Sequence, residues 1–295
     1  MADFGWTIDM EIIEKLRGEP LFQRCLLPNI LDGEVFPTIR DGHLSFYYRD
    51  IILFTYDGTF TTNLQYAFVP QVNNAYQNVD ETTLAGMKHH VHFQNAYSLI
   101  VDRCIHDQWG KEMDMGVSNF YRFSFATAFA DRYFLLARGI VLNTETDDEA
   151  TDCLLMDRKT GRLLFCMIKC YSNMENTQKY EVEEIVEPLK RYRDLIAKQR
   201  QAIIDWYGEY VRAIEVLTGI WLPAPTCLCD DCGLLICGFD EDQEKGKLKK
   251  IVDSLTEMGW PVYAIENIGD VTPEKLFKAL ARGGRVIEAN RIGRV

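Results

Sequence analysis

The chain has 295 residues, of which 47% are hydrophobic, so it can bury a core large enough for one large domain or for a core with a subdomain. Its formal net charge of −12 excludes a surface that coats nucleic acid broadly, because such binding needs many Lys and Arg side chains to neutralise phosphates. No run approaches the roughly 20 apolar residues of a membrane helix, no signal-peptide pattern is present, and the nine cysteines are scattered, so we expect a cytoplasmic protein with reduced thiols.

The first third of the chain is expected to form a small antiparallel β-meander. Residues 35–69 are rich in aromatic and β-branched side chains, which favour strands. The pairs Asp41-Gly42 and Asp57-Gly58 interrupt this stretch, and glycine after aspartate supplies the positive φ that tight hairpin turns need. The sequence therefore predicts hairpin turns at both pairs.

Residues 82–106 repeat apolar side chains every three or four positions, which predicts a helix. His89, His90 and His92 fall within this helix, and His89 and His92 would share one of its faces. Two histidines on one face can bind a metal ion, but we expect these to be solvated or packed in the core.

The middle of the chain predicts an apolar helix followed by three short strands. Residues 117–138 form a strongly apolar run with Gly139 just past its end, so we expect a largely buried helix. Its polar residues are expected to form salt bridges or to lie at the surface; they are Arg122, Asp131 and Arg132. The strands are expected at 140–143, 152–157 and 162–171, and an acidic loop separates the first two.

A long helix and an alternation of strands and helices complete the chain. Residues 183–217 carry an apolar stripe close to the helical period, so this helix must cover a sheet or another helix. Pro188 lies in its first turn or kinks it. After it we expect strands at 233–239, 261–266 and 285–288, with helices at 243–258 and 272–281, and this alternation favours a partly parallel sheet.

The segment 151–169 carries Asp152 at the start of one short strand and Lys169 at the end of the next. The chain resembles the PD-(D/E)xK nuclease superfamily in the order of its expected elements. The core of that superfamily has a helix, a three-strand meander that carries Asp and then Lys, a crossing helix and a further strand. The segments 36–62, 161–173 and 234–255 are similar to uncharacterised bacterial proteins with this core.

The resemblance implies a restriction-endonuclease-like mixed sheet flanked by helices, with an N-terminal antiparallel β extension and a helical insert. We expect a β-meander and helical subdomain over residues 1–110 and a nuclease-like α/β core over 111–295. It also implies Mg²⁺-dependent hydrolysis of phosphodiester bonds in DNA or RNA, with Mn²⁺ as a substitute, and a place in bacterial antiviral defence.

The resemblance assigns a metal-binding role to Asp152 and a water-orienting or water-activating role to Lys169. In the superfamily a second acid stands two positions before the lysine, but this sequence has Met167 there, and a thioether is a poor ligand for Mg²⁺. In one interpretation the acid has moved to Glu183, which follows Lys169 by 14 positions, or to the acidic loop with Asp147, Asp148 and Glu149. In the other, the fold persists without catalysis, as a pseudoenzyme that serves as a binding or scaffolding subunit for a partner protein or nucleic acid.

The long helix also carries a basic run, and most of its cations are expected on the solvated face opposite the apolar stripe. Lys190 and Arg191 lie close enough to the expected site to contact phosphates if nucleic acid binds. Any such contact would be local, because the net charge of −12 leaves no broad basic surface. A homo-oligomer is a further possible assembly, and no membrane partner is expected.

Two remaining features have simpler explanations than a site. Cys227, Cys229, Cys232 and Cys237 include a single Cys-x-x-Cys unit, whereas zinc sites usually pair two such units, so we expect packed thiols in place of zinc. The loop after residue 239 lies where open sheets often bind ligands, but it lacks a glycine-rich phosphate motif. Its acids are expected to cap a helix; they are Asp240, Glu241 and Asp242.

Overall fold

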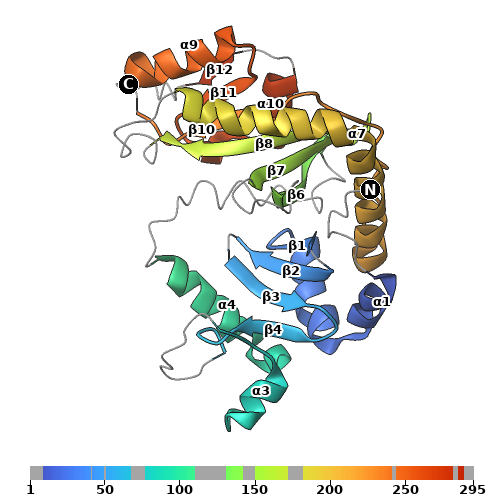
Figure 1. Ribbon diagram of the computed structural model, residues 1–295. Coiled ribbons are helices and arrows are strands. Elements are labelled where there is room, and N and C mark those ends of the chain that lie inside the picture. The colour runs from blue at the N-terminus through green and yellow to red at the C-terminus, as the bar shows by residue number, and fades with distance from the viewer. Residues whose placement is uncertain are drawn as a thin grey trace. The chain divides into compact units, whose positions relative to one another are not determined.

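The computed structural model describes residues 9–40, 42–49, 51–67, 77–109, 131–141, 150–171, 182–240, 244–281 and 285–288. The chain divides into two compact units, each with its own sheet (Figure 1). Unit 1 comprises residues 1–122 and 212–221, and unit 2 comprises residues 123–211 and 222–295. The expectation of an α/β chain with an antiparallel sheet near its N-terminus is confirmed.

Unit 1 is built on a five-stranded antiparallel sheet in the order β1-β2-β3-β4-β5. Gly42 and Gly58 have φ angles of 75° and 115°, as the predicted turns require. Aromatic side chains fill the core, where the ring of Phe54 lies 5.4 Å from that of Phe93 and 6.0 Å from that of Phe60. The strands are β1 (Val35–Arg40), β2 (His43–Tyr48), β3 (Ile51–Tyr56), β4 (Phe60–Asn63) and β5 (Asn78–Val79). The helices are α1 (Met10–Gly18), η1 (Phe22–Leu26), α2 (Leu27–Leu31), α3 (Glu81–Gly86) and α4 (Phe93–Trp109).

The prediction of one helix over 82–106 is wrong, because α3 and α4 are separate helices. Lys88 has a φ of 64°, a left-handed conformation that ends the first helix. The Glu81 side chain then accepts the N–H of Phe93 at 2.6 Å and caps the second helix. The three histidines lie in the connection between the helices, so His89 and His92 do not share a helix face.

Unit 2 is built on a mixed sheet in the order β12-β11-β10-β8-β7-β6, with β9 paired beside β8. The strands β6, β7 and β8 form an antiparallel meander, and β8, β10, β11 and β12 run parallel to one another. The predicted strand and helix alternation of the C-terminal third is therefore confirmed. The strands are β6 (Tyr133–Val141), β7 (Ala150–Asp157), β8 (Arg162–Cys170), β9 (Cys227–Leu228), β10 (Gly233–Cys237), β11 (Val262–Ile265) and β12 (Arg285–Glu288).

The predicted helix over 117–138 is wrong in its described part, since Tyr133 to Arg138 belong to β6. A short apolar run fits a buried strand as well as a buried helix, and pairing with β7 decides in favour of the strand. Arg132 was expected to form a salt bridge or to lie at the surface, and it forms an ion pair with Asp157. Arg122 and the rest of the run up to residue 130 lie outside the described residues.

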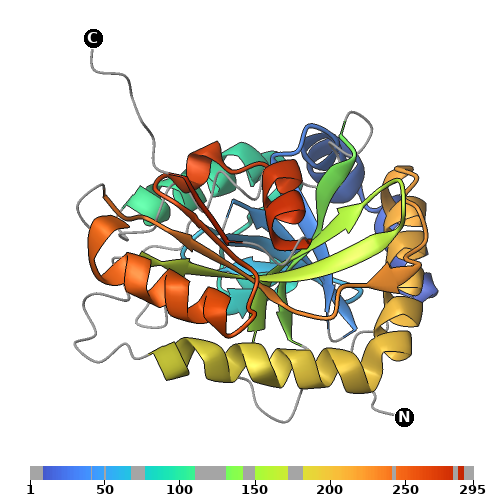
Figure 2. The same cartoon turned by 90° about the horizontal axis from the view of Figure 1, so that it is seen from above.

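Helices cover both faces of the unit 2 sheet, as Figure 2 shows from above. On one face, the ring of Phe165 in β8 packs against Tyr192 and Tyr207 of the long helix, with centroids 6.5 and 6.3 Å apart. On the other face, Gly233 of β10 lies directly against Leu280, where a Cβ would come within 2.5 Å of the leucine side chain. The helices are α7 (Val182–Thr218), η3 (Glu244–Leu248), α9 (Lys249–Glu257), η4 (Ile268–Asp270) and α10 (Pro273–Ala281).

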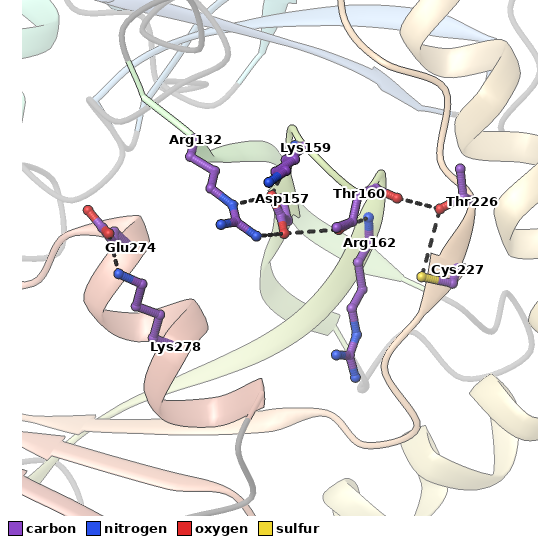
Figure 3. A network of polar contacts seen from close by, with 9 residues as sticks. All are labelled: Arg132, Asp157, Lys159, Thr160, Arg162, Thr226, Cys227, Glu274 and Lys278. Carbon is purple, nitrogen blue, oxygen red and sulfur yellow. Dashed lines mark hydrogen bonds and ion pairs between the residues drawn. The ribbon is translucent and has the colours of Figure 1, made fainter.

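The turn between β7 and β8 is held by the carboxylate of Asp157 (Figure 3). Its two oxygens accept hydrogen bonds from Arg132 at 2.8 and 2.7 Å, from the N–H of Lys159 at 3.0 Å and from the hydroxyl of Thr160 at 2.9 Å. Gly161 completes the turn with a φ of 64°, and a Cβ there would lie 2.6 Å from a backbone oxygen. These contacts fix where β8 begins relative to β7.

The hydrogen bonds from Arg132 lower the pKa of Asp157 from its ordinary value of 3.8 to about 2, and those from Thr160 and Lys159 act in the same direction. A carboxyl group with a lowered pKa in the folded state stabilises the protein above its unfolded-state pKa. That contribution is lost as the pH falls through about 2. Asp157 is therefore a stabilising turn residue, and its charge is part of the turn.

We predict that Asp157→Asn lowers the free energy of unfolding at pH 7 by about 1–2 kcal/mol, a value reduced to allow for the half-exposed Arg132. Urea denaturation at several pH values should show the difference from wild type shrinking between pH 4 and pH 2. As a control, Glu187→Gln removes an exposed ion pair of 3.8 Å with Lys190 and should change stability by less than about 0.5 kcal/mol. A difference that stays constant down to pH 2 would contradict the role assigned to the carboxylate.

Candidate functional site

The β7–β8 hairpin brings Asp152 and Lys169 to the same end and the same face of the unit 2 sheet. Leu154 of β7 pairs with Phe165 of β8, and side chains on a strand alternate between faces. Asp152, two residues before Leu154, and Lys169, four after Phe165, therefore lie on the face that carries Phe165. This is the face that α7 covers.

Asp152 is a half-buried carboxyl group that is bound to the backbone of the neighbouring strand. Its Oδ2 accepts the N–H of Ile168 at 2.5 Å. Burial raises its pKa, and this effect outweighs the Ile168 hydrogen bond and the positive charges of Lys169 and Arg138, which lower it. The two cations thus offset only part of the cost of burying the charge, and Asp152 is harder to ionise than an ordinary aspartate.

Met167 occupies the position where the resemblance places a second acid. It lies between Phe165 and Lys169 in alternation, so its side chain is on the same face as Asp152. Only 4% of Met167 is exposed, and it is packed as part of the core. The backbone therefore presents the position correctly, and the side chain lacks the oxygen that a hard cation needs.

Glu183 is exposed in the first turn of α7. The helix lies along β8 and runs in the opposite direction (Figure 1). Because the two elements run in opposite directions, α7 begins at the end of the pair where β8 finishes, which is the end that carries Lys169.

Among the described residues, no group of three or more His, Cys, Asp or Glu is placed to hold a metal ion. Mg²⁺ is usually held by one or two carboxylates with several waters, and Asp152 is one carboxylate on the face that carries Lys169. Asp147, Asp148 and Glu149 lie outside the described residues.

The cysteines predicted to be packed are mostly packed. Cys229, Cys232 and Cys237 are buried and Cys227 is exposed. Burial raises the pKa of the Cys229 and Cys232 thiols, which disfavours the thiolate that zinc binds. In the loop before η3, Asp240 is exposed, while Glu241 and Asp242 lie outside the described residues.

Cations of α7 are tied to acids of the same chain, a pairing that the sequence did not reveal. Arg193 bonds to Asp231, and its guanidinium stacks 3.7 Å from the ring centroid of Trp260. Arg200 bonds to Asp230 and to the backbone oxygen of Leu228.

The two residues predicted to contact phosphates lie on the same helix. Lys190 is 3.8 Å from Glu187, and Arg191 is exposed on the helix surface. The ion pairs of the neighbouring arginines reduce the positive charge that this stretch offers to phosphates.

Unit 1 contains a cleft of about 630 Å³ that no sequence motif indicated. Its volume is in the range of small-molecule sites, and its walls mix two phenylalanines with charges of both signs. Within it, His92 lies 3.3 Å from Glu81, and Lys15 donates to the backbone oxygen of Gly58 at 2.6 Å. The lining comprises Lys15, Glu19, Pro20, Leu21, Gly58, Thr59, Phe60, Glu81, Thr82, His92, Phe93, Gln94 and Asn95.

Comparison of the chain with protein-family models, with curated proteins and with solved structures finds no match. Within the described part of the chain, no helix has both the length and the apolar character needed to cross a membrane.

We predict that wild type gains stability relative to Asp152→Asn as the pH falls from 7 toward 3.8, the ordinary value for an aspartate. A raised folded-state pKa means that ionised Asp152 costs free energy in the folded protein, and protonation removes this cost. Urea denaturation of both proteins over this pH range tests the sign. Asp157→Asn serves as the contrast, because there the advantage of wild type shrinks on acidification. An equal pH dependence of wild type and Asp152→Asn would show that Asp152 does not titrate as described.

Proposed function

We propose that this protein is a binding or scaffolding subunit built on a nuclease-type core, and that it does not itself hydrolyse phosphodiester bonds. The order of elements in unit 2 supports the nuclease-type part of the proposal: a meander of β6, β7 and β8, the crossing helix α7, and β10 parallel to β8. The placement of Asp152 and Lys169 on one face of that meander supports it as well.

The observation that carries the non-catalytic part is Met167. Its position faces the same side as Asp152 and Lys169, but it presents a buried thioether where a hard cation would need a carboxylate. Asp152 keeps a raised pKa, because burial outweighs the positive charges of Lys169 and Arg138. A site of this composition holds a carboxyl group that is partly compensated by cations, which is suited to structure or recognition.

A protein partner fits the charges better than a nucleic acid. The chain has a net charge of −12, and the α7 arginines Arg193 and Arg200 are bonded to Asp231 and Asp230. Phosphate binding depends on cationic side chains that neutralise phosphates and so displace the counterions condensed on the nucleic acid, and these arginines already have carboxylate partners.

A second function, Mg²⁺-dependent hydrolysis of DNA or RNA, is favoured by one observation. Glu183 lies in the first turn of α7, the helix that covers the face with Asp152 and Lys169, so it is a candidate to replace the missing acid. The two functions differ in whether cleavage depends on Asp152 and Lys169.

We predict that purified protein does not degrade plasmid DNA or RNA with Mg²⁺ or Mn²⁺ beyond the level of Lys169→Ala. Gel electrophoresis of time courses for wild type, Lys169→Ala and Asp152→Ala provides the measurement. Equal degradation by all three indicates a contaminating nuclease and is consistent with the proposal. Cleavage by wild type that both variants lose would overturn it, and Glu183→Gln would then test whether Glu183 supplies the second acid.

Restoring the acid tests whether the fold still presents a metal position. We predict that Met167→Glu gains Mn²⁺ binding, because the new carboxylate joins Asp152 on one face of the sheet. Mn²⁺ should stabilise this variant by about 2.7 kcal/mol at a concentration 100 times its Kd, measured by thermal unfolding. Met167→Gln is the matched control, with the same shape and no charge, and should not respond. Equal responses of the two variants would argue against a nuclease-type site.

A further inference from the structure

The last residues of the neighbouring strands β8 and β10 are cysteines that lie side by side on one face of the sheet. Cys170 and Cys237 are register partners on these parallel strands, and their sulfur atoms lie 3.7 Å apart. Neighbouring strands are about 4.8 Å apart, which lies within the range of Cα separations that a disulfide spans. The geometry therefore allows a bond between the two sulfurs without rearrangement of the strands.

The two thiols differ in access to solvent. Cys170 is partly exposed, whereas Cys237 is fully buried and its sulfur lies 3.8 Å from the backbone oxygen of Lys169. The pair lies on the opposite face of the sheet from the Lys169 side chain, because successive residues alternate between faces. A dissolved oxidant can thus react with Cys170 first, and Cys237 is held close enough to react with the oxidised Cys170 sulfur.

A second cross-strand pair provides an internal comparison. Cys153 of β7 and Cys166 of β8 are also register partners, but both are fully buried. The hydrogen bond that Cys153 donates to Cys166 and its burial raise the pKa of Cys153, and burial raises that of Cys166. Raised pKa values leave little thiolate, and burial blocks access, so this pair should resist the same oxidant.

We propose that Cys170 and Cys237 are a redox modification site that closes to a disulfide on exposure to hydrogen peroxide. The thiolate of Cys170 attacks one peroxide oxygen and the O–O bond breaks. The departing hydroxide takes up the proton that the Cys170 thiol released, so a sulfenic acid and one water result. The thiol of Cys237 then attacks the Cys170 sulfur and expels a second water. Two electrons pass from the sulfurs to the peroxide, and the two thiol protons end in the waters.

The bond would join the carboxyl ends of β8 and β10 covalently, next to Lys169 in the strand and on the opposite face of the sheet from its side chain. A thiol reductant would reopen it by exchange, because one of its sulfurs is partly exposed. This inference does not depend on whether the protein cuts, binds or does neither.

The experiment uses the full chain with Cys227→Ser, since the exposed Cys227 would otherwise link molecules to each other. Reduced protein is treated with hydrogen peroxide, quenched, alkylated under denaturing conditions and digested with trypsin. We expect the count of alkylated thiols to fall by two, with a linked peptide that contains Cys170 and disappears on reduction. Trypsin leaves Cys229, Cys232 and Cys237 on one peptide, so fragmentation of the linked peptide must assign the partner.

Two further measurements sharpen the test. Cys237→Ala should abolish the link and leave Cys170 as a sulfenic acid that a carbon-acid probe captures. Cys153 and Cys166 should stay reduced in the folded protein and react only after unfolding. The proposal is overturned if Cys170 stays reduced, if it pairs with another cysteine, or if Cys153 and Cys166 oxidise as fast. If Cys237→Ala fails to fold, the test still stands, because the protein with all four cysteines intact allows oxidation of Cys170 and Cys237 to be compared with that of Cys153 and Cys166.

Discussion

The register of the β7–β8 hairpin is the constraint on which the candidate site of unit 2 depends, because it sets the face of the sheet on which each β8 side chain lies. The side-chain period of a strand is two, so a slip of one residue would exchange the faces of every side chain on β8. Asp157, held by Arg132 and by the turn itself, fixes that register. With it fixed, Met167 and Lys169 face α7, and Cys166 and Cys170 face the opposite helix layer.

Asp152 and Lys169 share a face of the sheet for reasons that need no metal ion. Burial of a carboxylate is costly, and the positive charges of Lys169 and Arg138 offset part of that cost for Asp152 whether or not a metal binds. The two residues can therefore persist for structural reasons. Met167 needs no partner because it is apolar, and it contributes packing beneath α7 instead.

Sequence periodicity predicted those elements whose apolar pattern fits only one kind of secondary structure. The apolar stripe of α7 and the alternation of the C-terminal third belong to this class. The run from Tyr133 to Arg138 was assigned wrongly because a fully buried strand and a buried helix share the same composition. The break between α3 and α4 was missed because Lys88, a residue with no turn preference, adopts a left-handed conformation there.

The parts of the site that could not be predicted depend on contacts between distant segments. No local pattern joins Arg193 to Asp231 and Trp260, because the partners lie 38 and 67 positions away along the sequence. The unit 1 cleft has the same origin, since its walls come from α1 and the residues after it, the β3–β4 turn, and the starts of α3 and α4. Asp152 and Lys169 differ from these cases because they belong to one hairpin, so local sequence alone places them on one face of the sheet, and their role stays a prediction.

Arg193 also sets how unit 2 can come apart. One guanidinium joins the middle of α7 to the loop before β10 through Asp231, and to Trp260, two residues before β11. A local opening that lifted α7 from the sheet would have to break a charged hydrogen bond and a cation–π contact together. The helix, the loop and the strand should therefore open as one cooperative block, with hydrogen-exchange protection that rises and falls together across segments far apart in the chain.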